Sequence, residues 1–189
     1  MRIRFNDVGG RWHPGGMRTD LPALPSPTRD RPRLPEGYGL PDNDDDLLEW
    51  GEVERRLTAS KHYWIASVRP DGRPHTIPRW GVWVDGRFWY DGAPDTVHAR
   101  NAEQNRAVTL TLEDGKEAVI VEGSSHATRA DAEGLGPRLA AAFAKYHDDG
   151  YAPEADAWTG EDGGGLRVIT PEKAMVWFDF PGDVTRFRW

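Results

Sequence analysis

The sequence predicts a mainly β protein of the α+β class, built as an antiparallel, closed or nearly closed barrel with a few flanking helices. The first observation is that Asp-Gly pairs at 71–72, 85–86 and 114–115 each separate runs rich in apolar and aromatic residues. An Asp-Gly pair flanked in this way is the strongest short-range hairpin signal, because glycine accepts the positive φ that the turn needs. The second is that the resulting strands, about five to seven, outnumber the helical patterns, and closure into a barrel removes exposed sheet edges.

Length, composition and charge limit the class of protein. A chain of 189 residues fits one domain, or one domain with an appendage. The hydrophobic fraction of 38% is typical of globular proteins, and we expect neither a membrane span nor a secretory leader, because the first residues lack an apolar run. The absence of cysteine excludes disulfides and thiolate metal sites, and a net charge of -7 argues against nucleic-acid binding. We therefore expect a cytoplasmic protein that binds neither membranes nor nucleic acid.

The N-terminal region differs in composition from the rest. Prolines recur too often between 21 and 41 for a helix or an inner strand. Residues 1–42 are therefore predicted to be an extended or disordered arm, or one that lies against a partner subunit, and residues 43–189 to be the folded domain. The domain begins with acids followed by apolar residues at near-helical spacing, which predicts an amphipathic helix over roughly 45–58.

The next segment predicts a β-meander. Asp71-Gly72 joins a strand at 63–68 to one at 75–84, and Asp85-Gly86 joins that strand to one at 87–91. Pro78 cannot donate a ladder hydrogen bond, so it marks an edge, a bulge or a strand opened for a ligand. Asp114-Gly115 similarly connects strands at 107–113 and 118–128. A long bent strand or a strand pair is expected over 166–180.

Two polar or amphipathic segments between these strands predict helices. Residues 93–107 are compatible with a helix that begins at Asp95 or Thr96, and its free N–H groups favour an anion near Thr96, His98 and Arg100. The alternative is an ordinary surface turn with a solvated arginine. Residues 137–149 predict a second helix with an apolar face, and 150–165 predict a loop.

The order of these features resembles the pyridoxamine 5′-phosphate oxidase-like superfamily of flavin and deazaflavin oxidoreductases. The matching features are a strand with Pro-His and Pro-x-Trp at 74–80, an aromatic strand, the helix start "ARN", and the hairpin "VTLTLEDGKEAVIVEG". The ending "DVTRFRW" is similar to the tail of many members. The resemblance covers about 47–128 and 166–189, and leaves the arm and the 150–165 loop unexplained.

The resemblance implies a split β-barrel that forms a homodimer, with FMN at the subunit interface. It implies hydride transfer with a small organic substrate, a task in which the cofactor supplies the chemistry and the protein positions it. The cofactor-binding positions of the superfamily correspond to His75, Thr76, Ile77, Pro78, Tyr90, Asp91, Thr96, His98, Arg100, Trp177 and Arg186. His98 stands where many members have lysine or arginine, and a histidine is mostly neutral at pH 7.

Two alternatives follow from the same residues. A deazaflavin coenzyme in place of FMN needs a wider basic groove, for which Arg79, Arg87, Arg100 and Arg106 are candidates. A non-enzymatic split barrel that holds a flavin or haem, or has lost its cofactor, is suggested by His98.

No catalytic side chain and no metal site is predicted, because the six histidines lack ligand spacing and no nucleophile motif is present. His75 and His126 are expected to be structural, with flavin contact or proton delivery as the alternative. Trp80, Trp83 and Trp89 are expected to pack in the core or an interface, with stacking on the cofactor as the alternative.

Overall fold

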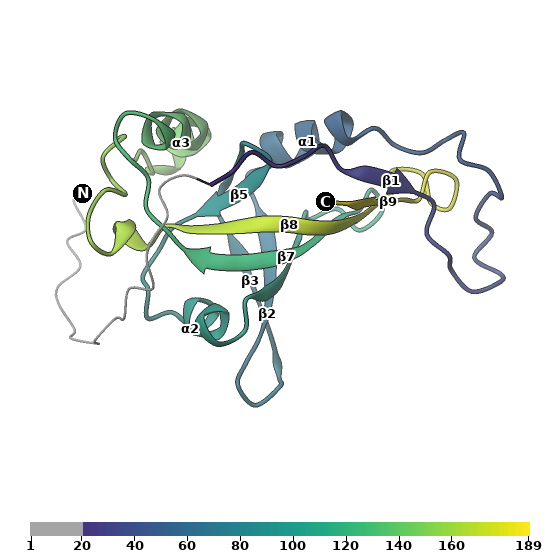
Figure 1. Ribbon diagram of the computed structural model, residues 1–189, viewed down its shortest axis with the longest axis horizontal. Helices are drawn as coiled ribbons and strands as arrows, with labels where there is room; N and C mark the ends of the chain where they lie inside the picture. The colour runs from purple at the N-terminus through teal and green to yellow at the C-terminus, as the bar shows by residue number, and fades with distance from the viewer. Residues whose placement is uncertain (1–20) are drawn as a thin grey trace.

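The structure is a computed structural model that describes residues 21–189 (Figure 1). The part of the predicted arm before residue 21 lies outside the described residues. The helices are α1 (Trp50–Ala59), α2 (Val97–Gln104), α3 (Leu135–Phe143), and the short 3-10 helices η1 (Ala144–Asp149) and η2 (Gly163–Gly165). The strands are β1 (Thr28–Asp30), β2 (Tyr63–Val68), β3 (Pro74–Arg79), β4 (Val82–Val84), β5 (Arg87–Tyr90), β6 (Ala107–Thr111), β7 (Val119–Ala127), β8 (Arg167–Val176) and β9 (Thr185–Arg188).

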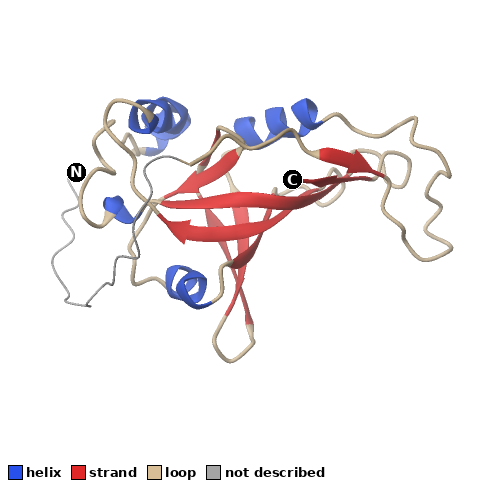
Figure 2. Ribbon diagram, in the orientation of Figure 1, coloured by secondary structure: helices blue, strands red, loops and turns tan. Residues whose placement is uncertain are grey.

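The strands form one antiparallel sheet that curls without closing, which confirms the predicted split-barrel fold of the α+β class. The strand order is β1-β9-β8-β7-β6-β2-β3, and β4 pairs with β5, which in turn pairs with β8. The first half of β8 thus faces β5 and its second half faces β9. Figure 2 shows the helices arranged around this sheet, and Figure 1 shows the β2–β3 hairpin projecting from the body beyond α2.

The three predicted hairpins are present. β2 pairs with β3, β4 with β5, and β6 with β7. At the second turn Asp85 and Gly86 have φ values of 54° and 72°, the pair of positive angles that a two-residue type I′ connection requires. The long strand or strand pair expected over 166–180 is a single strand, β8, over Arg167–Val176.

One predicted strand is divided in two. The segment 75–84 was expected to be continuous, but it breaks at Trp80 and Gly81 into β3 and β4. A Cβ on Gly81 would lie 2.2 Å from Cζ of Phe88, so glycine lets the chain approach β5 closely here. As a result β3 stays with β2 as an edge of the sheet, while β4 joins β5.

The core consists of two apolar clusters. One lies between α1 and the concave face of the sheet, and includes Val53, Leu57, Trp83 and Phe88. The other lies between α3 and the opposite face of β5 and β8, and includes Trp89. Trp83 and Trp89 are thus core residues, whereas Trp80 stays 38% exposed and stacks on Tyr146 with ring centroids 5.0 Å apart.

Two helices differ from their predicted bounds. α1 begins at Trp50 instead of near residue 45, because the acids at 42–46 lie in turns that precede it. α3 covers 135–143, and the rest of the predicted segment continues as the 3-10 helix η1. Within residues 21–189 no helix is both long and apolar enough to cross a membrane.

Part of the proline-rich arm joins the sheet. Residues 28–30 form β1, which pairs with β9 from Thr28 opposite Arg188 to Asp30 opposite Arg186. The Arg29 guanidinium donates to the carbonyls of Leu47 and Leu48. These contacts connect the arm to the barrel, mainly through β9. The division of the chain at residue 42 into an arm and a folded domain stays a prediction.

Candidate functional site

The predicted cofactor strand is β3, one edge of the sheet. Its side chains alternate between exposed residues, such as Thr76 and Pro78, and the half-buried His75 and Ile77. In the described sheet β3 has β2 as its single neighbour. An edge strand has main-chain groups that are not paired within the sheet. Pro74 and Pro78 have no N–H, so they cannot donate a hydrogen bond to a further strand at this edge.

α2 packs against β2, β3 and β7, over a group of buried polar side chains. Asn101 Nδ2 donates to Ser67 Oγ at 3.0 Å, and the hydroxyls of Tyr90 and Ser125 lie 3.1 Å apart. Each of these residues is at most 3% exposed. Buried polar groups require partners, so this network fixes α2 against the barrel.

Two arginines lie close to α2. Arg167, the first residue of β8, is 4% exposed; its Nη1 donates to Glu103 at 2.8 Å and its Nε to Ser125 at 3.4 Å. Arg79, the last residue of β3, donates through Nη2 to the carbonyl of Asp91. Arg167 Nη2 and Arg79 Nε are buried and have no hydrogen-bond partner among the described residues. Unpartnered buried N–H groups on a cation are costly, which favours an anion beside them.

His98 is only 6% exposed and is close enough to both arginines to be affected by their charges. Burial, followed by the charges of Arg79 and Arg167, lowers the pKa of His98 to about 4. Its Nε2 lies 3.4 Å from Thr96 Oγ1. The imidazole is therefore neutral at pH 7, and the positive charge at this place comes from the two arginines. We call Arg79, Thr96, His98 and Arg167, together with the first turn of α2, the cradle.

The first turn of α2 keeps its N–H groups free of side-chain caps. Thr96 is the N-cap residue, but its hydroxyl donates backward to the carbonyl of Ala93 at 3.0 Å and caps nothing. The first N–H groups of a helix have no partner within the helix, and the helix dipole adds partial positive charge there. The start of α2 thus adds anion-binding capacity beside the arginines.

The side chain of Asp91 faces away from the cradle. Its carboxylate accepts hydrogen bonds from the Tyr151 hydroxyl and from Trp158 Nε1, the latter at 2.8 Å. Both donors belong to the predicted 150–165 loop. Asp91 therefore anchors this loop with its side chain and holds Arg79 with its carbonyl.

Three predicted site residues lie outside the cradle of the same chain. Arg100 is exposed and donates to the carbonyl of Asp95 at the start of α2. Trp177 follows the end of β8 at which Val176 pairs with Val119, and Arg186 of β9 pairs with Met175 near the same end. Arg167 pairs with Ala127 at the other end. The two ends of this ladder are roughly 25–30 Å apart at the rise of an extended strand.

Sequence reasoning missed Arg167, and it considered Arg79 only as part of a wide basic groove. The signal for Arg167 was a charged residue directly before the apolar pair Val168 and Ile169, since an arginine is seldom fully buried unless it is paired. Arg87 does not lie on the same side of the sheet as the cradle. Tyr90 packs near His98, and Arg87 lies on the opposite face of β5 from Tyr90.

Comparisons with known proteins agree with this architecture. The family model of pyridoxamine 5′-phosphate oxidase matches residues 50–174. A solved conserved hypothetical protein from Mycobacterium tuberculosis is 21% identical with a TM-score of 0.52, the match covering 77% of this chain and 88% of that one.

A protein from Listeria innocua named for pyridoxamine 5′-phosphate oxidase is 14% identical with a TM-score of 0.50, over 68% of this chain and 98% of that one. An F420 reductase is 22% identical with a TM-score of 0.46, over 73% and 95% respectively. No curated protein sequence matches the chain. Because the family model spans more than half of the sequence, the chain belongs to the pyridoxamine 5′-phosphate oxidase family.

Proposed function

We propose that this protein is an FMN-dependent oxidoreductase that acts on a small organic substrate and binds the FMN phosphate in the cradle. The observation that carries the proposal is the pair of buried arginine N–H groups without partners, on Arg79 and Arg167, beside the uncapped start of α2. A phosphate fits this donor set, since arginine forks and helix N-termini are the usual phosphate ligands in proteins.

Position 98 holds a neutral histidine where many members of the superfamily have a positively charged side chain, and the arginines of the cradle supply positive charge instead. A neutral His98 supplies no charge, but Arg79 and Arg167 come from different strands and both make the surroundings of His98 more positive, although Glu103 pairs with Arg167 and offsets part of its charge. Each charge-assisted hydrogen bond to a phosphate contributes about 1.5–3 kcal/mol. The lysine or arginine that other members carry in the helix start is therefore replaced by arginines from β3 and β8.

A bound flavin supplies the hydride chemistry, and the residues of this chain bind and orient it. β3 offers its main chain along the open edge, next to Thr76 and Ile77. Arg79 ends the same strand, so a molecule held at its phosphate by the cradle extends along β3. The ring of Tyr90 lies near that of His98, and its hydroxyl forms a hydrogen bond with that of Ser125.

The proposal includes a homodimer formed over the outer face of β2 and β3. Trp64 and Val68 are each 39% exposed on this face, directly opposite Pro78 and Pro74. An exposed edge strand with apolar neighbours is a surface that proteins normally cover. A second copy would also supply Trp177 and Arg186, which are too far from the cradle of their own chain.

Equilibrium titration with FMN, followed by flavin fluorescence, tests the phosphate assignment. Arg79→Gln and Arg167→Gln are each expected to weaken FMN binding at least tenfold, because each removes a charged donor. Arg138→Gln is the matched control, since Arg138 pairs with Asp85 far from the cradle and its loss leaves FMN affinity unchanged.

Circular dichroism and urea unfolding verify that each variant is folded. Equal FMN affinity in folded wild-type, Arg79→Gln and Arg167→Gln proteins would overturn the phosphate assignment. Binding of the deazaflavin coenzyme F420, with no binding of FMN, would show that the cofactor is the deazaflavin. If light scattering shows a monomer at micromolar concentration, the proposed dimer and its shared cofactor interface are wrong.

A further inference from the structure

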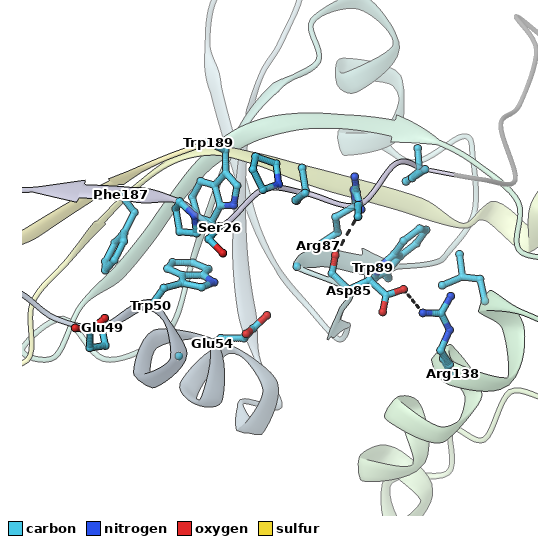
Figure 3. Close-up of a pocket in the computed structure, with 18 of the residues that line it drawn as sticks. Ser26, Glu49, Trp50, Glu54, Asp85, Arg87, Trp89, Arg138, Phe187 and Trp189 are labelled. Atoms are coloured by element: carbon cyan, nitrogen blue, oxygen red, sulfur yellow. Dashed lines mark hydrogen bonds and ion pairs between the residues drawn. The ribbon is translucent and has the colours of Figure 1, made fainter.

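A large pocket lies away from the cradle, beneath the described part of the N-terminal arm (Figure 3). Its volume is about 960 Å³, within the size range of small-molecule sites. Residues 21–27 of the arm form one wall, and α1, the β4–β5 turn, the start of α3 and the end of β9 form the others. None of the cradle residues lines this pocket, so the proposed function gives it no task.

One end of the pocket combines aromatic rings with a carboxylate. Trp50, the first residue of α1, meets Trp189 with ring centroids 4.6 Å apart and Phe187 with centroids 5.1 Å apart. Figure 3 shows these three rings grouped together, with Glu54 of the next turn of α1 beside them. Residues four apart on a helix lie on the same face, so Trp50 and Glu54 border the same space. We call these four residues the aromatic end.

The charges at the opposite end of the pocket cancel. Arg138 forms an ion pair with Asp85, and Arg87 is close enough to Asp85 to be affected by its charge. Asp131 adds a second carboxylate charge, because the hydrogen bonds that it accepts come from uncharged main-chain N–H groups at the start of α3. Two arginines therefore lie with two carboxylates, and this end selects neither sign of charge.

The charges at the aromatic end do not cancel. Glu49 is paired with Arg29, at 2.5 Å between the two charged groups. Glu54 accepts a hydrogen bond from Trp83 Nε1 at 3.0 Å, and this uncharged donor leaves the charge of the carboxylate in place. Within residues 21–189 no Lys, Arg or His forms an ion pair with Glu54, since the arginines of the lining are engaged elsewhere. The excess negative charge of the pocket therefore lies beside the rings.

We propose that this pocket is a second binding site, distinct from the cradle, that takes a small organic cation: an aromatic ring with an ammonium group on a short spacer. The ring packs against Trp50 and Trp189, and the ammonium donates a hydrogen bond to Glu54. An ammonium group is also attracted to the faces of tryptophan rings, which adds to the preference for a cation.

Three probes with the same ring separate the contributions of shape and charge. Isothermal titration calorimetry at pH 7 with tryptamine, indole and indole-3-propionate presents a cation, a neutral ring and an anion to the same protein. Tryptamine is expected to bind at least fivefold more tightly than indole, because its ammonium has a partner in Glu54, and indole-3-propionate more weakly than indole. Binding of indole-3-propionate as tight as that of tryptamine, or no binding of tryptamine at millimolar concentration, would overturn the proposal.

A substitution of nearly the same shape tests the charge of Glu54. Glu54→Gln removes the charge and keeps an oxygen that accepts from Trp83, and circular dichroism verifies the fold. It is expected to lower the affinity for tryptamine to that for indole and to leave indole binding unchanged. Glu52→Gln is the matched control, because Glu52 belongs to the same helix but does not line this pocket. Unchanged tryptamine binding in folded Glu54→Gln would contradict the proposal.

Further measurements locate the bound probe. Ser26→Trp is expected to abolish binding of tryptamine and indole, because Ser26 lies on the arm beside the aromatic end and a large ring there fills the space (Figure 3). Asp131→Asn is expected to retain tryptamine binding, and a loss in the folded variant would place the ammonium at the opposite end of the pocket. Saturating FMN leaves tryptamine binding unchanged. Displacement of tryptamine by FMN, or unchanged binding in Ser26→Trp, would place the probe elsewhere and overturn the proposal.

Discussion

Asp30 receives two hydrogen bonds from the guanidinium of Arg186, at 2.8 and 2.7 Å, across the pairing of β1 with β9. Arg188 adds a third contact to the same carboxylate at 2.9 Å. This arrangement connects a strand near the beginning of the chain to the last strand.

The first prediction concerns this ion pair. Hydrogen bonds from Arg186 lower the pKa of Asp30 to about 2. Because the folded state lowers this pKa, the pair stabilises the fold above pH 4 and loses its effect as the pH falls from about 4 toward 2. Asp30→Asn is expected to cost no more than about 1 kcal/mol at pH 7, since both groups are partly exposed. Urea unfolding at pH 7 and pH 3 measures it; an equal difference at both pH values would contradict the assignment.

The second prediction concerns His98. Its pKa of about 4 in the folded protein is below the usual 6.5, because of burial and of Arg79 and Arg167. The unfolded chain then binds more protons between these values, so stability falls as the pH drops from about 6.5 to about 4, by up to about 3 kcal/mol. His98→Gln is expected to lack this dependence. A proton NMR titration that gives His98 an ordinary pKa would refute it.

The third prediction concerns the contact that holds the 150–165 loop against the strand before α2. Gly165 has a φ of 73°, and a Cβ there would lie 1.8 Å from the carbonyl oxygen of Gly92. Gly165→Ala is expected to lower the free energy of unfolding by at least about 3 kcal/mol, from strain and a backbone clash. Gly150→Ala is the matched control, because its φ is 82° with nothing within 4 Å, and should cost about 1 kcal/mol. Equal costs would show that the close approach is unimportant.

The fourth prediction concerns Lys145, whose ammonium donates hydrogen bonds at the C-terminal end of α1. Its Nζ donates to the carbonyl of Ser60 at 2.6 Å and to the Tyr63 hydroxyl at 3.0 Å. Lys145→Met removes a charged donor from the Tyr63 hydroxyl and from the Ser60 carbonyl, which keeps the Tyr63 hydroxyl as its other donor, and is expected to cost about 1–3 kcal/mol in chemical unfolding. Lys61→Met removes a surface ion pair with Asp149 and should stay within about 1 kcal/mol. A smaller loss in Lys145→Met than in Lys61→Met would reverse this ranking.

The fold could be read from the sequence largely because its turns are specified locally. Asp85 and Gly86 adopt the two positive φ angles that the hairpin needs, so the pairing of β4 with β5 follows from two residues. The break at Gly81 could not be foreseen in the same way. It depends on the ring of Phe88 approaching from a neighbouring strand, a contact that no local pattern records.

The candidate site was predictable only in part, for a related reason. Thr96 and His98 are neighbours in sequence at a recognisable helix start. Arg167 reaches His98 from a strand about 70 residues away, through the pairing of Tyr90 with Arg167. Trp177 and Arg186 matched cofactor positions by resemblance, yet they lie at the other end of the β7–β8 ladder. The sequence of one chain cannot show which positions two copies share.

Comparison of FMN with riboflavin tests the central proposal most directly, because the two molecules share the ring and ribityl chain and differ in the phosphate alone. If the cradle binds the phosphate through Arg79, Arg167 and the start of α2, FMN binds at least 100-fold more tightly than riboflavin in the same titration. Arg79→Gln then narrows that ratio while leaving riboflavin affinity unchanged. Equal affinities for FMN and riboflavin, or binding of neither, would contradict the account.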